Sequence, residues 1–121
     1  MSLISLEYTD TMGEKKSLKF SESLLQRAYN KASLFVMRVD GKSMQPLIQD
    51  RALVVVDLSQ KELEDGAIYI VHCENRSWIK RAKIGENGAF FISINHDFAH
   101  LVYDAKSVRL IGRVLLTFSA L

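Results

Sequence analysis

A serine and a lysine are the two residues of this sequence whose types and surroundings suggest chemistry. Ser43 follows Gly41, where the alternating apolar run of residues 34–39 ends. A strand that breaks at a glycine and presents a hydroxyl is one way to expose a nucleophile. Lys80 lies further along the chain in the segment 77–82 and is the base that the sequence offers. Their types therefore suggest a Ser-Lys dyad.

The surroundings of Lys80 decide whether it can act as a base. A free lysine has a pKa of about 10.4, whereas a general base works best with a pKa of roughly 7–8. Residues alternate between the two faces of a strand, so Trp78, Lys80 and Ala82 share an apolar face, and Arg81 and Lys83 point the other way. Burial on that face disfavours the ammonium and lowers the pKa of Lys80.

Two structural alternatives remain open for the same residues. Lys80 can extend its ammonium to solvent at the edge of the domain. Ser43 can serve as the N-cap of a helical turn that starts near Met44.

His96 and His100 have a spacing that suits metal binding on a helix, but no third ligand is evident, so we predict no metal and no cofactor.

Composition narrows the class of protein. The 121 residues fit one domain, and 48% apolar with 25% charged residues is typical of a soluble globular protein. A net charge of +2 is too small to suggest that this domain binds nucleic acid by itself. The single cysteine, Cys73, excludes an internal disulfide. No apolar stretch is long enough to span a membrane and no signal peptide is visible, so we expect a cytoplasmic protein without a membrane partner.

The pattern of apolar residues predicts a mostly β protein, with twisted sheets that form a sandwich or a partly open barrel. Strands are expected at residues 34–39, 52–56, 67–73, 77–84, 89–95 and 108–118. Gly112 predicts a bulge or bend in the last strand. We divide the chain into an N-terminal arm or linker, residues 1–32, with a short helix within 20–29, and a β domain, residues 33–121.

Five blocks of sequence resemble the C-terminal domain of LexA-type repressors. This is the S24 serine peptidase family, which includes UmuD and the lambda-type phage repressors. The blocks occur in the family's order and together cover about residues 34–116. They are Val39-Asp40-Gly41-Lys42-Ser43-Met44-Gln45-Pro46 with Asp50 and the strand 53–57, then residues 65–71, Trp78-Ile79-Lys80-Arg81, Phe91-Ile92-Ser93-Ile94-Asn95 and Leu110-Ile111-Gly112-Arg113-Val114.

The resemblance implies a LexA-like C-terminal fold and a reaction. Ser43 is then the nucleophile, Lys80 the general base, and backbone N–H groups around Ser43, that of Met44 among them, hold the oxyanion. The substrate is an upstream loop of the same polypeptide, and its cleavage inactivates the repressor. The resemblance also implies a homodimer formed partly through the C-terminal strand, a RecA filament on single-stranded DNA as the trigger, and operator binding through an N-terminal domain that these residues do not include.

Two departures from the family pattern leave the function open. Arg51 replaces a glycine of the family, which has a cost if that position adopts a positive φ. The family cleaves an Ala-Gly or Cys-Gly bond, whereas the upstream candidate here is Met12-Gly13. That bond is an atypical cleavage site, or the cut lies in a missing segment, or the protein does not cleave itself. The alternatives are a non-catalytic dimerisation module of a phage-type regulator and a UmuD-like accessory protein of translesion synthesis.

Overall fold

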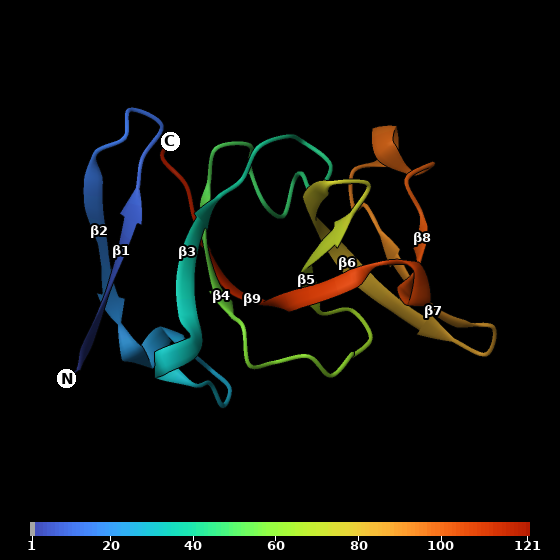
Figure 1. Ribbon diagram of the computed structural model, residues 1–121, viewed down its shortest axis with the longest axis horizontal. Helices are drawn as coiled ribbons and strands as arrows, with labels where there is room; N and C mark the ends of the chain where they lie inside the picture. The colour runs from blue at the N-terminus through green and yellow to red at the C-terminus, as the bar shows by residue number, and fades with distance from the viewer. Residues whose placement is uncertain (1) are drawn as a thin grey trace.

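A computed structural model describes residues 2–121 and contains two antiparallel sheets (Figure 1). The smaller sheet pairs β1 (Leu3–Thr9) with β2 (Lys15–Ser21). The larger has seven strands in the order β3-β4-β9-β5-β6-β7-β8. Its strands are β3 (Leu34–Arg38), β4 (Leu53–Asp57), β5 (Ile68–Cys73), β6 (Arg76–Gly85), β7 (Gly88–Ile92), β8 (Tyr103–Asp104) and β9 (Arg109–Phe118). The mostly β class is confirmed, and the arrangement is consistent with a sandwich rather than a closed barrel.

The predicted strands of the larger sheet are present with bounds that differ by a few residues. The continuous β-branched run in β4 is buried on both faces, because Val54, Val55 and Val56 have no exposed area. β5 and β6 form the expected hairpin. Its two-residue turn, Glu74-Asn75, has φ values of 53° and 62°, as the twist of a tight hairpin requires.

Gly112 lies where the pairing of β9 changes from β5 to β4. A Cβ at this position would be 2.7 Å from the Asp57 carbonyl oxygen, so only glycine fits. Gly112 pairs with Ile70, and the register then shifts so that Val71 pairs with Leu110. The predicted irregularity therefore occurs next to this glycine, and it lets β9 pair with β5 along its first half and with β4 along its second.

The N-terminal segment is more ordered than expected. The β1–β2 hairpin packs beside β3 at one end of the molecule (Figure 1). Ile4 and Phe20 are buried against Leu34 and Val55 of the larger sheet. The hairpin is therefore joined to the β domain by an apolar cluster.

The helix expected within residues 20–29 is not confirmed. This region has a single 3-10 turn, Glu22–Leu24, with no buried residue. Ser21 caps it, because its hydroxyl accepts a hydrogen bond from the Ser23 N–H. Leu24 remains exposed, so no apolar stripe forms that would favour a longer helix.

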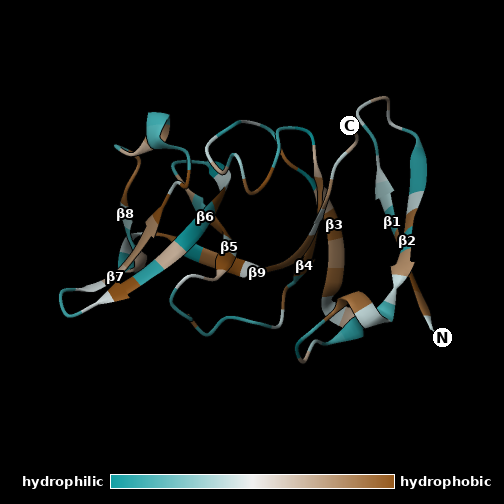
Figure 2. Cartoon of the chain, turned by 180° about the vertical axis from the view of Figure 1, so that it is seen from behind, coloured by the Kyte–Doolittle hydropathy of each residue, from teal (hydrophilic) through white to brown (hydrophobic). Residues whose placement is uncertain are grey.

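Apolar residues concentrate in β3, β4 and β9 (Figure 2). The main core cluster joins Val54, Ile70 and Ile79 of the sheet to Met44 and Ile48 of the β3–β4 loop. This loop contains the predicted nucleophile and is therefore held against the sheet by its own apolar residues. Within residues 2–121, no helix is long and apolar enough to cross a membrane.

Candidate active site

The loop between β3 and β4 presents Ser43. It closes on itself at its base, where the Val39 N–H donates to the Ala52 carbonyl (2.8 Å) and the Arg51 N–H donates to the Val39 carbonyl (2.9 Å). The N–H of Gly41 donates to the carboxylate of Asp50 (2.8 Å). Arg51 has a φ of 71°, which is the positive value anticipated at the position where the family has glycine.

Asn95 fixes the backbone on both sides of Ser43. Its N–H donates to the Ser43 carbonyl (2.9 Å), and its side-chain amide donates to the Lys42 carbonyl (2.8 Å). Met44, which follows Ser43 in the sequence, has an exposed fraction of 2%, and its burial anchors the loop to the core. In the described part of the chain, no hydrogen bond from the Met44 N–H is found.

Lys80 is buried within the larger sheet. Its side chain has an exposed fraction of 0%, and its Nζ lies 5.2 Å from the Trp78 ring centre and 5.6 Å from that of Tyr103. Nζ donates a hydrogen bond to the hydroxyl of Ser93 (2.6 Å). None of the ion pairs among residues 2–121 includes Lys80. The burial predicted from strand alternation is therefore present, and the alternative of an ammonium in solvent is wrong.

Burial changes the protonation of this lysine. Removal from water disfavours the ammonium and lowers the pKa of Lys80 from its ordinary value, while the nearby Cys73 is a smaller influence in the opposite direction. Burial also raises the pKa of the Cys73 thiol, which favours its neutral form. The environment therefore favours a neutral amine at Lys80, which is the form that can accept a proton.

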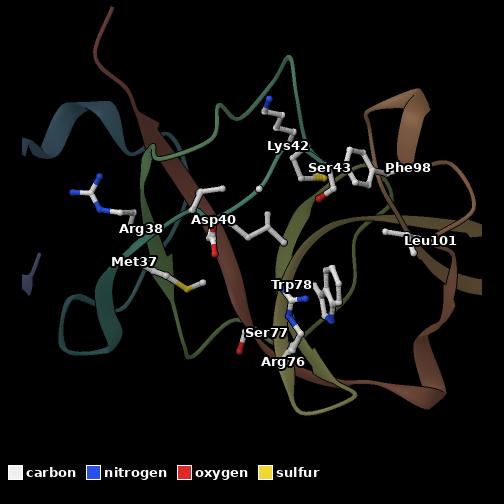
Figure 3. Close-up of a pocket in the computed structure, with 14 residues that line it drawn as sticks. Met37, Arg38, Asp40, Lys42, Ser43, Arg76, Ser77, Trp78, Phe98 and Leu101 are labelled. Atoms are coloured by element: carbon white, nitrogen blue, oxygen red, sulfur yellow. The ribbon is translucent and has the colours of Figure 1, made fainter. Parts of the chain in front are cut away.

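A cavity of about 380 Å³ lies between the Ser43 loop and the start of β6 (Figure 3). Ser43 and Phe98 lie on one side of it, and Trp78 and Arg76 lie on the other. Trp78 thus contacts the cavity that Ser43 lines and also lies near the Lys80 amine. Among the described residues, however, the hydrogen-bond partner of Lys80 is Ser93 and not Ser43.

Ser93 and Asn95 are the site residues to which the sequence analysis assigned no role. The β6–β7 hairpin could have indicated Ser93, because Gly85 pairs with Gly88 across a two-residue turn that includes Asn87. The same register, continued past the Arg81–Ile92 pair, places Ser93 opposite Lys80. The hydrogen bonds from Asn95 to the Ser43 loop join distant parts of the sequence, and no local pattern predicts them.

The predicted cleavage bond Met12-Gly13 is at the tip of the β1–β2 hairpin. The Met12 side chain is 84% exposed, and Gly13 has a φ of 80°. The tip and the residues Arg38, Asp40 and Arg51 line a common depression, next to the Ser43 loop. Met12 does not line the cavity that contains Ser43.

His96 and His100 do not have the helical arrangement that their spacing would allow. His96 is in the 3-10 turn His96–Phe98, so the two residues are not arranged along a continuous helix. Within residues 2–121, no group of three or more His, Cys, Asp or Glu side chains is placed to hold a metal ion.

Comparison with known proteins identifies the class to which this fold and site belong. A family model described as Peptidase S24-like matches residues 5–115. The chain therefore belongs to the Peptidase S24-like family, and the match includes β2 and β1 from its third residue onward.

Two curated relatives are each 32% identical over 101 residues. One is an uncharacterised HTH-type transcriptional regulator of Haemophilus influenzae, where the match covers 79% of this chain and 42% of the relative. The other is the repressor protein CI of Enterobacteria phage phi80, where it covers 80% of this chain and 43% of the relative. The chain thus spans less than half the length of the curated relatives it matches.

Proposed function

We propose that Ser43 and Lys80 form a catalytic dyad that cleaves a peptide bond of its own polypeptide, and that this cleavage inactivates a dimeric transcriptional regulator. The observation that carries the proposal is the burial of Lys80 without an ion-pair partner among the described residues. A buried lysine is costly in its charged form, and its hydrogen-bond partner here is a neutral hydroxyl. These conditions favour the free amine that a general base requires.

The reaction is acyl transfer. The neutral amine of Lys80 takes the proton of the Ser43 hydroxyl as Oγ attacks the scissile carbonyl carbon. The N–H of Met44 stabilises the oxyanion. Lys80 then gives the proton to the leaving amine as the C–N bond breaks, and water hydrolyses the acyl-serine.

Met12-Gly13 is the proposed scissile bond. Its place at an exposed hairpin tip beside the Ser43 loop supports the assignment. Because Met12 lies outside the cavity of Ser43, cleavage within one chain requires the hairpin to leave its packing against β3. We propose that a RecA filament on single-stranded DNA favours this rearrangement.

The DNA-binding and dimerisation parts of the proposal rest on other features. The relatives named as a repressor and as an HTH-type regulator support operator binding through a helix-turn-helix domain outside these residues. Residues 114–118 of β9 pair with β4 along one edge only, within the described part of the chain. The other edge supports a homodimer formed partly through the C-terminal strand.

A non-catalytic dimerisation module is the second candidate. The observation in its favour is that the amine of Lys80 contacts Ser93 rather than Ser43. In this case the fold persists and the pair Ser43-Lys80 has no chemical role.

Self-cleavage at alkaline pH, followed by mass spectrometry, tests the proposal. Raising the pH deprotonates Lys80 and should increase the cleavage rate without an activator. We expect Ser43→Ala and Lys80→Ala to abolish the cut. Lys83→Ala is the matched control, because Lys83 is an exposed lysine of the same strand. A wild-type chain that stays folded and intact across the pH range would favour the non-catalytic module.

A further inference from the structure

Ser93 is the first residue after β7, whose last residue, Ile92, pairs with Arg81 of β6. This pairing brings the chain next to Lys80, which precedes Arg81 in β6. The Oγ of Ser93 is 2.6 Å from the Nζ of Lys80. The contact is therefore made one residue beyond the last pair of the hairpin.

The chemistry of this partner suits a neutral amine. A neutral lysine has two N–H donors and one lone pair, and only the lone pair can accept a proton. A carboxylate at this position would stabilise the ammonium and raise the pKa of Lys80. A hydroxyl accepts one N–H without adding a charge, which leaves the lone pair available and restricts its direction.

The segment Ser93-Ile94-Asn95 holds both halves of the candidate site. Ser93 contacts the amine of Lys80, whereas Asn95 donates to the carbonyls of Lys42 and Ser43. Ile94, between them, packs on the apolar cluster that includes Met44. Three consecutive residues therefore fix the base and the nucleophile relative to one another.

We propose that Ser93 is a positioning residue, whose hydroxyl accepts an N–H from Lys80 and directs the lone pair of the amine toward Ser43. The inference rests on the proposed self-cleavage and names a third side chain for that reaction. Ser93 itself forms no bond to the substrate and exchanges no proton with it.

The proposal predicts two changes of opposite sense when the hydroxyl is removed. Hydrogen bonds to a charged donor are stronger than those to a neutral one, so the hydroxyl stabilises the ammonium more than the amine. Its removal should lower the pKa of Lys80 further, and the cleavage rate should reach its alkaline plateau at a lower pH. The plateau rate itself should fall by about tenfold, because the amine is less well oriented.

Ser93→Thr and Ser93→Val form a matched pair for the test. The two replacements have nearly the same shape, but only threonine keeps the hydroxyl, and valine leaves little space for a substitute water. Self-cleavage is measured for both variants and the wild type as a function of pH, and thermal unfolding confirms that each is folded. We expect the threonine variant to keep the wild-type midpoint, and the valine variant to show a lower midpoint and a lower plateau.

Three results would overturn the proposal, and they are distinguishable. Equal midpoints and plateaus in the two variants would show that the hydroxyl does not position Lys80, while self-cleavage by Ser43 would stand. Cleavage that survives Ser43→Ala but is lost in Ser93→Val would make Ser93 the nucleophile. Absence of cleavage in the folded wild type at every pH would reject the proposed function, and with it this role of Ser93.

Discussion

Ser43 and Lys80 are held in place by different physical means. Ser43 is on a loop, is only partly buried, and owes its position to hydrogen bonds on its backbone and to the buried neighbour Met44. Lys80 is within a sheet, has no exposed area, and makes one side-chain hydrogen bond among residues 2–121, to Ser93. The structure thus fixes the backbone of Ser43 through hydrogen bonds, and lowers the pKa of Lys80 through burial.

Because the two residues are held in different ways, we expect substitutions near Ser43 and substitutions near Lys80 to change different properties. A change around the Ser43 loop should alter the geometry of attack and leave the pKa of Lys80 unchanged. A change around Lys80 should alter both the pH dependence of the reaction and the stability of the fold.

Lys80→Met should have the largest effect on the reaction. It should abolish self-cleavage, yet it should raise the free energy of unfolding at pH 7 by about 1–3 kcal/mol, because an apolar side chain replaces a buried amine. The folded-state pKa of Lys80 lies below its unfolded value, so the unfolded state binds more protons between the two pKa values. Wild-type stability therefore rises with pH through that window, and the advantage of methionine shrinks.

Urea unfolding between pH 6 and pH 10.5 measures this difference. Lys83→Met is the control, and its effect should be small because Lys83 is exposed. A loss of stability in Lys80→Met at pH 7 would contradict the assigned cost of burying the amine.

Asn95 variants should have an intermediate effect and act on the nucleophile alone. Asn95→Ala removes the donor to the Lys42 carbonyl, which should reduce stability by about 1–2 kcal/mol and slow cleavage by about tenfold. Asn95→Asp also lacks this donor but keeps the oxygen that accepts the Asp97 N–H and caps the following turn. Both variants should therefore cleave slowly.

The pH at which the cleavage rate reaches half of its plateau distinguishes the Asn95 variants from Ser93→Val. It should remain at the wild-type value in Asn95→Ala, because the surroundings of Lys80 are unchanged. A shifted midpoint in this variant would mean that the two halves of the site are not controlled separately.

Arg51→Gly should have the smallest effect and should increase stability. Arg51 has a φ of 71°, a conformation that is costly for a residue with a Cβ and free of that cost for glycine. Glycine also loses more entropy on folding, so the net gain should be about 0.5–1 kcal/mol. Arg51→Ala removes the same side chain without relieving the backbone, and urea unfolding should show no such gain. Equal stability of the two variants would indicate that the backbone at this position is not strained.

The larger sheet was predictable from sequence because its strands carry long apolar runs. The burial of Lys80 followed from alternation in β6, where Trp78 and Ala82 share its face. The β1–β2 hairpin was missed because each of its strands contributes only one buried residue, Ile4 and Phe20, among exposed and half-buried ones. Its polar residues around Asp10 form a tight turn, in which the Asp10 carboxylate accepts the N–H groups of the tip.

The candidate site was predictable only in part. The residue types at positions 43 and 80 suggested the chemistry, but the partner of the amine depends on the register of β6 against β7. Ser93 can be identified as the partner of Lys80 only when that register is known. Asn95 acts on a loop more than fifty residues earlier, through contacts that form only in the folded chain.

The pKa of Lys80 in the folded protein is the most direct test of the account. It can be measured by NMR from the pH dependence of the side-chain Cε signal. We expect Lys80 to lose its proton at a lower pH than a free lysine, whose pKa is about 10.4, in the folded state and without any activator. Titration of Lys80 at or above the pKa of a free lysine would contradict the claim that burial lowers the pKa of Lys80.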